Sequence, residues 1–429
     1  MGKTEITDRP QSTDDVPTRT GKVINFLSDT VTKPTLEMAQ AITDVILNGR
    51  VGDDEYGLDE VVQELEEKAA KATGMEAAIL VPSGLMANQI AILVHAERTS
   101  EKILEKCRRA TNPNYRNPIE RGGVVMLGHN SHIATWEVGA PSILAGVIFR
   151  TVKKGDNIIL GEDVRASYRA PSIWYPTTKL LCLENSLING KVVPLPTMES
   201  ACTAAMEYGI PVHLDGARVF NAATRMLELE EDDDGNVRGL RDFGKELLYR
   251  KVREITSSLK KTGGSMMFCL SKGLASPVGS VLCGGEDFIS KARSYRKLLG
   301  GGMRQAGVLA ACGILSIDKM ALRLWEDHAN ARYLAELLND HVLTSENKIN
   351  INEIETNMVF CNISMKNPRN EEHFVATLKD TKGIKINGRD VNNTNKNGDG
   401  LFRFVTHNDV SREDIEYAVQ VISDFVKKG

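Results

Sequence analysis

The chain carries apolar residues in two different periods. Stretches 35–47 and 59–72 place them every three or four positions, with glutamate and lysine between them, and this pattern predicts amphipathic helices. Short continuous apolar runs, which are typical of buried strands, then alternate with turn and helix signals. These runs are 77–81, 123–127, 144–151, 179–183, 211–214, 265–270 and 279–283.

Short buried strands separated by helices indicate an α/β fold, a mostly parallel sheet with helices on both faces, because apolar side chains must cover each face. The long helical pattern at 303–340 is followed by shorter strand and helix signals, which are typical of a small α+β domain. The expected division is a disordered polar arm at 1–24, a large α/β domain at 25–345 with insertions near 101–121 and 226–263, and a small C-terminal domain at 346–429.

Composition and charge argue against several classes of partner. The chain has 429 residues, of which 41% are hydrophobic and 26% are charged, and this is typical of a globular protein with more than one domain. A formal net charge of -4 offers no bulk attraction to nucleic acid or anionic membranes, and no apolar run reaches membrane-spanning length. Seven cysteines without metal-ligand spacing indicate reduced thiols in the cytoplasm, and neither a disulfide framework nor a metal site is expected.

A lysine and an aspartate, Lys272 and Asp215, each follow a predicted strand. In α/β sheets these strand ends form the edge at which ligands bind. A partly desolvated amine there becomes nucleophilic toward an aldehyde, and a buried carboxylate needs a cation such as a protonated ring nitrogen. Taken alone, Lys272 equally fits a lysine that extends from a strand end to solvent. Asp215 alone fits better a carboxylate that pairs with Arg218 or caps the next helix.

Three further segments carry groups that suit a phosphorylated ring. Pro82-Ser83-Gly84-Leu85-Met86-Ala87-Asn88 lies between a strand and a helix, where free amide groups at the positive end of the helix bind phosphate. His132 opens another predicted helix at the same edge and could stack on a planar ring, although a lone histidine is more often structural. Arg304 follows three glycines in a flexible loop, from which its side chain could reach an anion.

Together, seven motifs in this order resemble the threonine aldolase family, whose members are fold-type I enzymes dependent on pyridoxal 5′-phosphate (PLP). The resemblance runs from about residue 25 to the C-terminus, apart from the two expected insertions. It implies the fold-type I architecture and PLP as the cofactor. The motifs are Ser28-Asp29-Thr30-Val31-Thr32, Val51-Gly52-Asp53-Asp54-Glu55-Tyr56-Gly57, Leu183-Glu184-Asn185-Ser186, Asp215-Gly216-Ala217-Arg218, Ser271-Lys272-Gly273-Leu274, Gly300-Gly301-Gly302-Met303-Arg304-Gln305 and Arg403-Phe404-Val405-Thr406-His407.

The resemblance also implies a role for particular residues. Lys272 would bind PLP as a Schiff base, Asp215 would face the pyridine nitrogen, and His132 would stack on the ring. Arg218 would reach the ring oxygen or the substrate carboxylate. Family members build their sites at a dimer interface, so a homodimer or homotetramer with shared active sites is expected. The other implied positions are Gly84, Leu85, Met86, Ser271 and Arg304 for the cofactor, and Ser28, Lys297 and Arg403 for the substrate.

Three positions depart from the family pattern. Leu27 replaces an arginine before Ser28, and Leu85 replaces the threonine of the usual phosphate turn. Leu187 stands where many members have a histidine that contacts the substrate's β-hydroxyl group. The base for that hydroxyl is therefore either His132 or a water molecule held by Lys297.

These observations predict an enzyme that cleaves L-threonine or a related β-hydroxy-α-amino acid to glycine and an aldehyde. Because the hydroxyl-directed histidine is missing, and because fungal alanine racemases share the fold, racemisation of a small amino acid such as alanine is the alternative. A non-catalytic oligomer that binds PLP is the third hypothesis.

Overall fold

The computed structural model describes residues 22–97, 122–152, 157–172, 174–232, 236–364, 370–389 and 400–428. The chain forms two compact units, one of residues Thr32–Glu326 and one that joins the segment ending at Val31 to Asp327–Gly429. The division thus falls at residue 327, inside the long helical region, where the sequence pattern indicated 345. The expected insertion at 101–121 and residues 1–21 of the expected arm lie outside the described residues, whereas Ile24 is buried in a strand.

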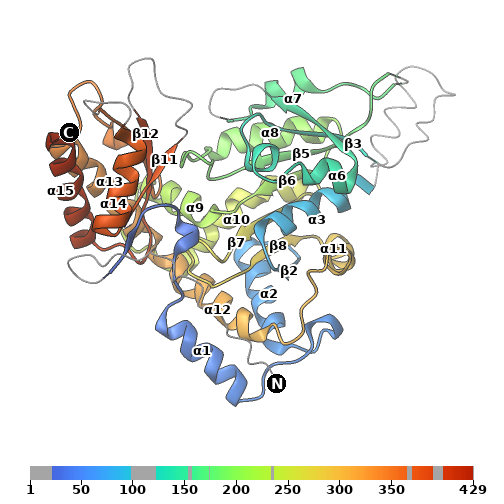
Figure 1. The fold of residues 1–429 in the computed structure, drawn as a ribbon. Coiled ribbons are helices and arrows are strands. Elements are labelled where there is room, and N and C mark those ends of the chain that lie inside the picture. The colour runs from blue at the N-terminus through green and yellow to red at the C-terminus, as the bar shows by residue number, and fades with distance from the viewer. Residues whose placement is uncertain are drawn as a thin grey trace, which may run out of the picture. The chain divides into compact units, whose positions relative to one another are not determined.

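The larger unit contains a seven-stranded sheet in the order β2-β8-β7-β6-β5-β3-β4 (Figure 1). Only β8 runs antiparallel to its neighbours, and the other pairings in this sheet are parallel, so the predicted mostly parallel sheet is confirmed. The strands are β2 (Ala77–Val81), β3 (Gly123–Gly128), β4 (Val147–Val152), β5 (Thr178–Glu184), β6 (Val212–Asp215), β7 (Ser265–Cys269) and β8 (Ser280–Gly284).

Alternating side chains divide the strands between two apolar layers. In β5, Leu181 and Leu183 join one core cluster, while Leu180 and Cys182 join another, as the two-residue period of a strand requires. The first layer is covered by α1 (Leu36–Leu47), α2 (Glu60–Thr73), α7 (Gly161–Ser167), α8 (Leu195–Glu207), α9 (Val219–Glu228), α10 (Lys245–Lys261) and α12 (Gly307–Asp318). The second is covered by α3 (Gly84–Glu97), α5 (His132–Thr135), α6 (Ala140–Ala145) and α11 (Glu286–Leu298).

The segment 226–263, expected as an insertion, supplies a core helix of the larger unit. Leu248, Val252, Ile255 and Leu259 of α10 are buried in the main core, and they recur at helical spacing. The charged residues between them form the solvent-facing side of the same helix, and their abundance explains why the sequence alone indicated a surface insertion.

The smaller unit is an α+β arrangement, as the sequence predicted for the C-terminal region. β9 (Met358–Ile363), β11 (Asn387–Arg389) and β12 (Gly400–Val405) form an antiparallel sheet in the order β11-β12-β9. The short strand β1 (Ile24–Asn25) pairs in parallel with β10 (Ile384–Lys385), which explains why the N-terminal segment belongs here. Helices α13 (Leu324–His341), α14 (Asn370–Lys382) and α15 (Arg412–Lys428) complete the secondary structure.

Short 3₁₀ helices and caps connect these elements. They are η1 (Asp29–Val31), η2 (Asp54–Tyr56), η3 (Met320–Arg323) and η4 (Ile351–Glu353). Asp59 caps α2, because its Oδ1 accepts from the amide groups of Val61 and Val62, and Gly74 ends that helix with a φ of 67°. No helix in the described parts of the chain combines the length and the apolar character needed to cross a bilayer.

Candidate active site

Polar side chains gather where the parallel strands of the larger unit end. Glu184 ends β5 and Asp215 ends β6, and the two residues are direct partners in the sheet register. His132 begins α5 just after β3, and Lys272 lies in the turn after β7. The charge of Lys272 influences the protonation of both His132 and Glu184, so these groups lie in one electrostatic environment. The structure therefore brings together the three residues that the sequence placed at this edge: His132, Asp215 and Lys272.

Asp215 is a buried carboxylate whose hydrogen-bond donors are both neutral. Its side chain accepts from Asn88 Nδ2 at 2.9 Å and from the amide of Ala217 at 3.1 Å, and the residue is only 3% exposed. Within the described residues it forms no ion pair, so the alternative in which it pairs with Arg218 is not realised. A buried anion without a cation is costly, and a protonated ring nitrogen would supply the missing charge. The Asp215 site thus fits the pyridine ring of PLP.

His132 is held by two carboxylates through different atoms. Its Nδ1 lies 3.0 Å from Glu137 Oε1, and its backbone N–H donates to Glu184 Oε2 at 2.9 Å. The hydrogen bond to Glu137 raises the pKa of His132 against the opposite effect of burial. Burial, and next the charge of Asp215, raise the pKa of Glu184 to about 7. Both groups are therefore shifted toward their protonated forms at this edge.

Lys272 is fixed by the turn that carries it. Ala275 N donates to Lys272 O at 2.9 Å, and Ser276 N donates to Leu270 O at 3.0 Å. Ser271 and Lys272 are both half-buried. No salt bridge involves the Lys272 amine among the residues that the structure describes. An amine without an ion-pair partner at this strand end is available to attack an aldehyde once it is deprotonated.

The first turn of α3 carries the predicted phosphate turn. Its leading amide groups have no preceding helical carbonyl groups to donate to, as at any helix N-terminus, although the Met86 amide donates to Ser83 Oγ at 3.2 Å. A Cβ atom on Gly84 would lie 2.7 Å from Met267 Cε and 2.9 Å from Cys269 Sγ. A side chain at this position would force Met267 and Cys269 to shift, so glycine lets the helix begin directly against β7. The available donors suit a phosphate group, with Gly84 and Leu85 better placed than Met86.

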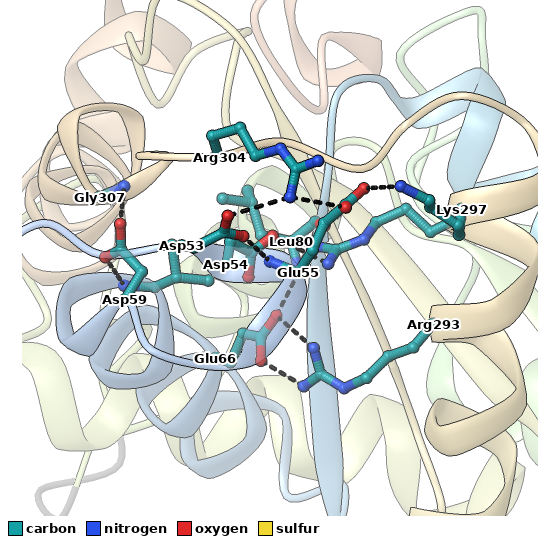
Figure 2. Close-up of polar contacts among 12 residues, drawn as sticks. Asp53, Asp54, Glu55, Asp59, Glu66, Leu80, Arg293, Lys297, Arg304 and Gly307 are labelled. Carbon is teal, nitrogen blue, oxygen red and sulfur yellow. Dashed lines mark hydrogen bonds and ion pairs between the residues drawn. The ribbon is translucent and has the colours of Figure 1, made fainter.

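The two cations expected near the cofactor and substrate, Arg304 and Lys297, have carboxylate partners in this chain. Arg304 Nη1 lies 3.0 Å from Asp53 Oδ2 and 2.9 Å from Glu55 Oε2, and Lys297 Nζ lies 2.5 Å from Glu55 Oε1. Figure 2 shows Arg304 reaching both acids, with Lys297 on the other side of Glu55. These contacts tie the glycine-rich loop and the end of α11 to the segment around η2, and among the described residues neither cation forms an ion pair with Asp215.

Ser28 and Arg403, expected at the substrate carboxylate, lie in the smaller unit. Ser28 Oγ accepts from the amide of Thr30 at 3.2 Å. Arg403 Nη2 donates to the carbonyl oxygen of Leu27 at 2.8 Å, so the two predicted residues are brought close to each other across 375 positions of sequence. Arg218 lies in the larger unit, half-buried at the start of α9, three residues after Asp215.

Two residues of the site were missed from the sequence. Glu137 and Asn88 are buried and hydrogen-bonded to His132 and Asp215, respectively. Asn88 and Gln89 form a polar pair in a largely apolar stretch of α3, which was a usable signal, whereas Glu137 had none. Leu187, in the place of the family's histidine, is only 1% exposed and packs in the main core, so its side chain offers no group to the site.

Comparisons with known proteins place the chain in a family. A family model described as β-eliminating lyase matches residues 25–364. The chain is 34% identical over 411 residues to a probable low-specificity L-threonine aldolase 2 from Arabidopsis thaliana, covering 95% of this chain and 97% of that protein. It is also 34% identical over 394 residues to a low-specificity L-threonine aldolase of Escherichia coli K12, covering 92% and 96%. The fold resembles a solved Leishmania major threonine aldolase with a TM-score of 0.68 at 16% identity, covering 94% and 99%.

Proposed function

The chain belongs to the β-eliminating lyase family and, within it, to the threonine aldolases, PLP-dependent enzymes of fold type I, and from this premise we propose the reaction that it catalyses. The proposed substrate is L-threonine or a related β-hydroxy-α-amino acid, and the products are glycine and an aldehyde. The observation that carries the proposal is the buried Asp215 without an ion pair, at the same sheet edge as Lys272 and His132.

The residues of this edge would divide the binding of PLP among them. Lys272 would hold the aldehyde carbon, Asp215 the ring nitrogen, and the first amide groups of α3 the phosphate. When bound, PLP supplies an electron sink for the electron pair that a broken Cα bond leaves behind. Asp215 would face the ring nitrogen, and the hydrogen bond from Asn88 holds that carboxylate in place.

His132 is the group that we assign to the β-hydroxyl proton. Its Nδ1 is taken by Glu137, which leaves Nε2 to accept the proton when the Cα–Cβ bond breaks. The competing candidate, a water molecule held by Lys297, is less well supported because Glu55 already pairs with the Lys297 amine. Leu187 is buried and has no polar group, so it takes no part.

Other assignments rest on the resemblance alone. Arg218 is proposed as a ligand of the substrate carboxylate or ring oxygen, and Ser28 and Arg403 as carboxylate ligands. We also propose that the protein is a homodimer or homotetramer, as the family pattern implies.

Incubation of the PLP-loaded protein with L-threonine and with L-allo-threonine tests the reaction. We expect glycine and acetaldehyde in equal amounts, and no more than the uncatalysed background with Lys272→Ala. In parallel, the enantiomeric purity of L-alanine is followed under the same conditions. Racemisation of alanine without aldehyde from any β-hydroxy amino acid would replace the proposed function by the racemase alternative. If neither substrate were turned over, the non-catalytic, PLP-binding alternative would remain.

A further inference from the structure

An amide side chain bridges the two carboxylates of the site. Asn88 Nδ2 donates to Asp215 Oδ2 at 2.9 Å and to Glu137 Oε1 at 2.7 Å. Asn88, Asp215 and Glu137 are all buried, at no more than 3% exposure each. His132, Glu137 and Asp215 each offer one potential ligand atom, and these three atoms lie within 4.8 Å of one another. Such a grouping by itself resembles a metal-binding site. The amide between the carboxylates already provides two donors, so hydrogen bonding explains this arrangement.

The hydrogen positions behind Asn88 follow from its two donors. Because both hydrogens of Nδ2 are used, Oδ1 must accept, and its partner at 3.0 Å is His213 Nε2. Burial lowers the pKa of His213 to about 4, so at neutral pH the ring carries its one hydrogen on Nε2. His213 Nδ1 then accepts from Ser265 Oγ at 2.9 Å, and Ser265 accepts from His95 Nε2 at 2.9 Å. Each group in this buried line donates toward the two carboxylates.

Glu137 meets donors at both of its oxygens. Oε1 accepts from Asn88 and faces His132 Nδ1 at 3.0 Å, while Oε2 accepts from Gln89 Nε2 at 2.6 Å. Since Oε1 can only accept from its ring partner, the hydrogen of His132 must stand on Nδ1. The orientation of the His132 ring is therefore set by a carboxylate that is itself held in place by two amides of α3.

We propose that Glu137 and Asn88 are positioning residues, which fix the ring orientation and hydrogen placement of His132 and join it to Asp215. This inference rests on the proposed function and deepens it. It explains how one hydrogen-bonded cluster aligns His132, proposed over the cofactor ring, with Asp215, proposed at the ring nitrogen. Glu137 acts through His132, and Asn88 acts through Asp215 and Glu137. Neither is assigned a contact with the substrate.

The test compares the titration of His132 in the PLP-loaded protein and in its Glu137→Gln variant by imidazole NMR, with the His132 signal assigned from its loss in His132→Asn. We expect a lower His132 pKa in Glu137→Gln, because the anion beside Nδ1 is gone while Glu184, Asp215 and Lys272 still face the ring. Glu66→Gln is the matched control: Glu66 is also buried but pairs with Arg293, so His132 should titrate as in the parent protein. An unchanged His132 pKa in Glu137→Gln would overturn the inference.

Two further variants separate positioning from packing. Glu137→Asp keeps the charge and is expected to retain the raised His132 pKa. This variant replaces Glu137→Gln in the test if Glu137→Gln does not fold. A His132 pKa in Glu137→Asp as low as that of an unperturbed histidine would contradict the inference. Asn88→Ala is expected to weaken PLP binding about tenfold, measured as a dissociation constant, because a charged acceptor loses its donor. PLP binding as tight as in the parent would refute the role of Asn88. Aldehyde release is assayed on the same samples, so a failed aldolase reaction is distinguished from a failed positioning role.

Discussion

At the scale of single residues, Glu184 shows how burial changes the pKa of a carboxyl group beside the proposed cofactor site. Its pKa of about 7 in the folded chain exceeds the ordinary value of 4.5, because burial and the charge of Asp215 disfavour the ionised form. Between these two pH values the folded protein holds a proton that the unfolded chain releases. Stability attributable to Glu184 is therefore fully present below about pH 4.5 and is lost as the pH rises through about 7.

Replacing Glu184 by glutamine removes this pH dependence, because the amide cannot ionise yet can still accept from the His132 amide. We expect the free energy of unfolding of the parent, relative to Glu184→Gln, to fall by on the order of 2 kcal/mol between pH 5 and pH 8. Urea unfolding of both proteins at the two pH values measures the difference. An equal difference at both pH values would show that Glu184 is ionised throughout.

Individual residues differed in how far the sequence could predict them. Lys272 and Asp215 follow apolar runs directly, so their place at the sheet edge could be derived from the strand pattern. Glu137 could not be found in this way, because its role depends on Asn88, which is 49 positions away in the sequence. The ion pairs of Arg304 and Lys297 were missed for the same reason, since their acidic partners lie more than 240 positions earlier.

Between elements, one buried ion pair connects η2, α11 and β2. Arg296 Nη2 lies 2.8 Å from Asp54 Oδ2, Arg296 Nη1 donates to the carbonyl oxygen of Leu80 at 2.8 Å, and both charged side chains are at most 5% exposed. Burial raises the pKa of Asp54 despite the opposite effect of Arg296, so the acid depends on this cation to stay ionised. The pair therefore anchors the segment that holds Arg304 and Lys297.

Arg296→Met leaves Asp54 buried without its cation and should lower the free energy of unfolding by about 3 kcal/mol, since removing one partner of a buried pair strands the other charge. Lys319→Met is the matched control, because the Lys319–Glu37 pair is more than half exposed, and it should cost less than about 1 kcal/mol. Urea unfolding measures both. Equal losses in the two variants would mean that burial of the Asp54–Arg296 pair has no energetic consequence.

Most helices and strands of the described chain could be predicted from local periodicity. The expected helices at 35–47 and 59–72 correspond to α1 and α2 within one residue at each end. The strand order and the reversed direction of β8 could not be predicted, because they depend on pairings between residues far apart in the sequence. Local charge also misled: α10 was assigned to an insertion although one of its faces is apolar and buried.

At the scale of the whole molecule, the burial of the cysteine side chains shows how well the core excludes solvent. The six described cysteines, Cys182, Cys202, Cys269, Cys283, Cys312 and Cys361, are all free and buried. Burial raises the pKa of Cys202 to about 11 and that of Cys283 to about 12, which keeps both thiols in the unreactive protonated form.

A thiol-reactive dye should therefore label at most one cysteine rapidly in the native protein, although the chain contains seven, because Cys107 alone lies outside the described residues. In urea all seven should react. Counting the labelled thiols in both states, with Cys107→Ser as control, checks this expectation. Two or more rapidly labelled thiols in the native Cys107→Ser protein would contradict the closed core.

The chain divides into two compact units at a residue other than the one at which the sequence pattern changes. The pattern of strand and helix signals changes near residue 345, yet the smaller unit begins at Asp327 and also includes the segment before Thr32. The N-terminal segment belongs to this unit because Ile24 pairs with Ile384, and no local pattern of the sequence reveals that pairing. The cofactor-binding residues that we propose around Lys272 all lie within the larger unit.

Attachment of PLP to Lys272 is tested most directly by reducing the PLP-loaded protein with borohydride and mapping the modified peptide by mass spectrometry. We expect the phosphopyridoxyl group on the peptide that contains Lys272 and on no other lysine. The same label on a different lysine, with Lys272 unmodified in a protein that cleaves threonine, would contradict the assignment of the active site.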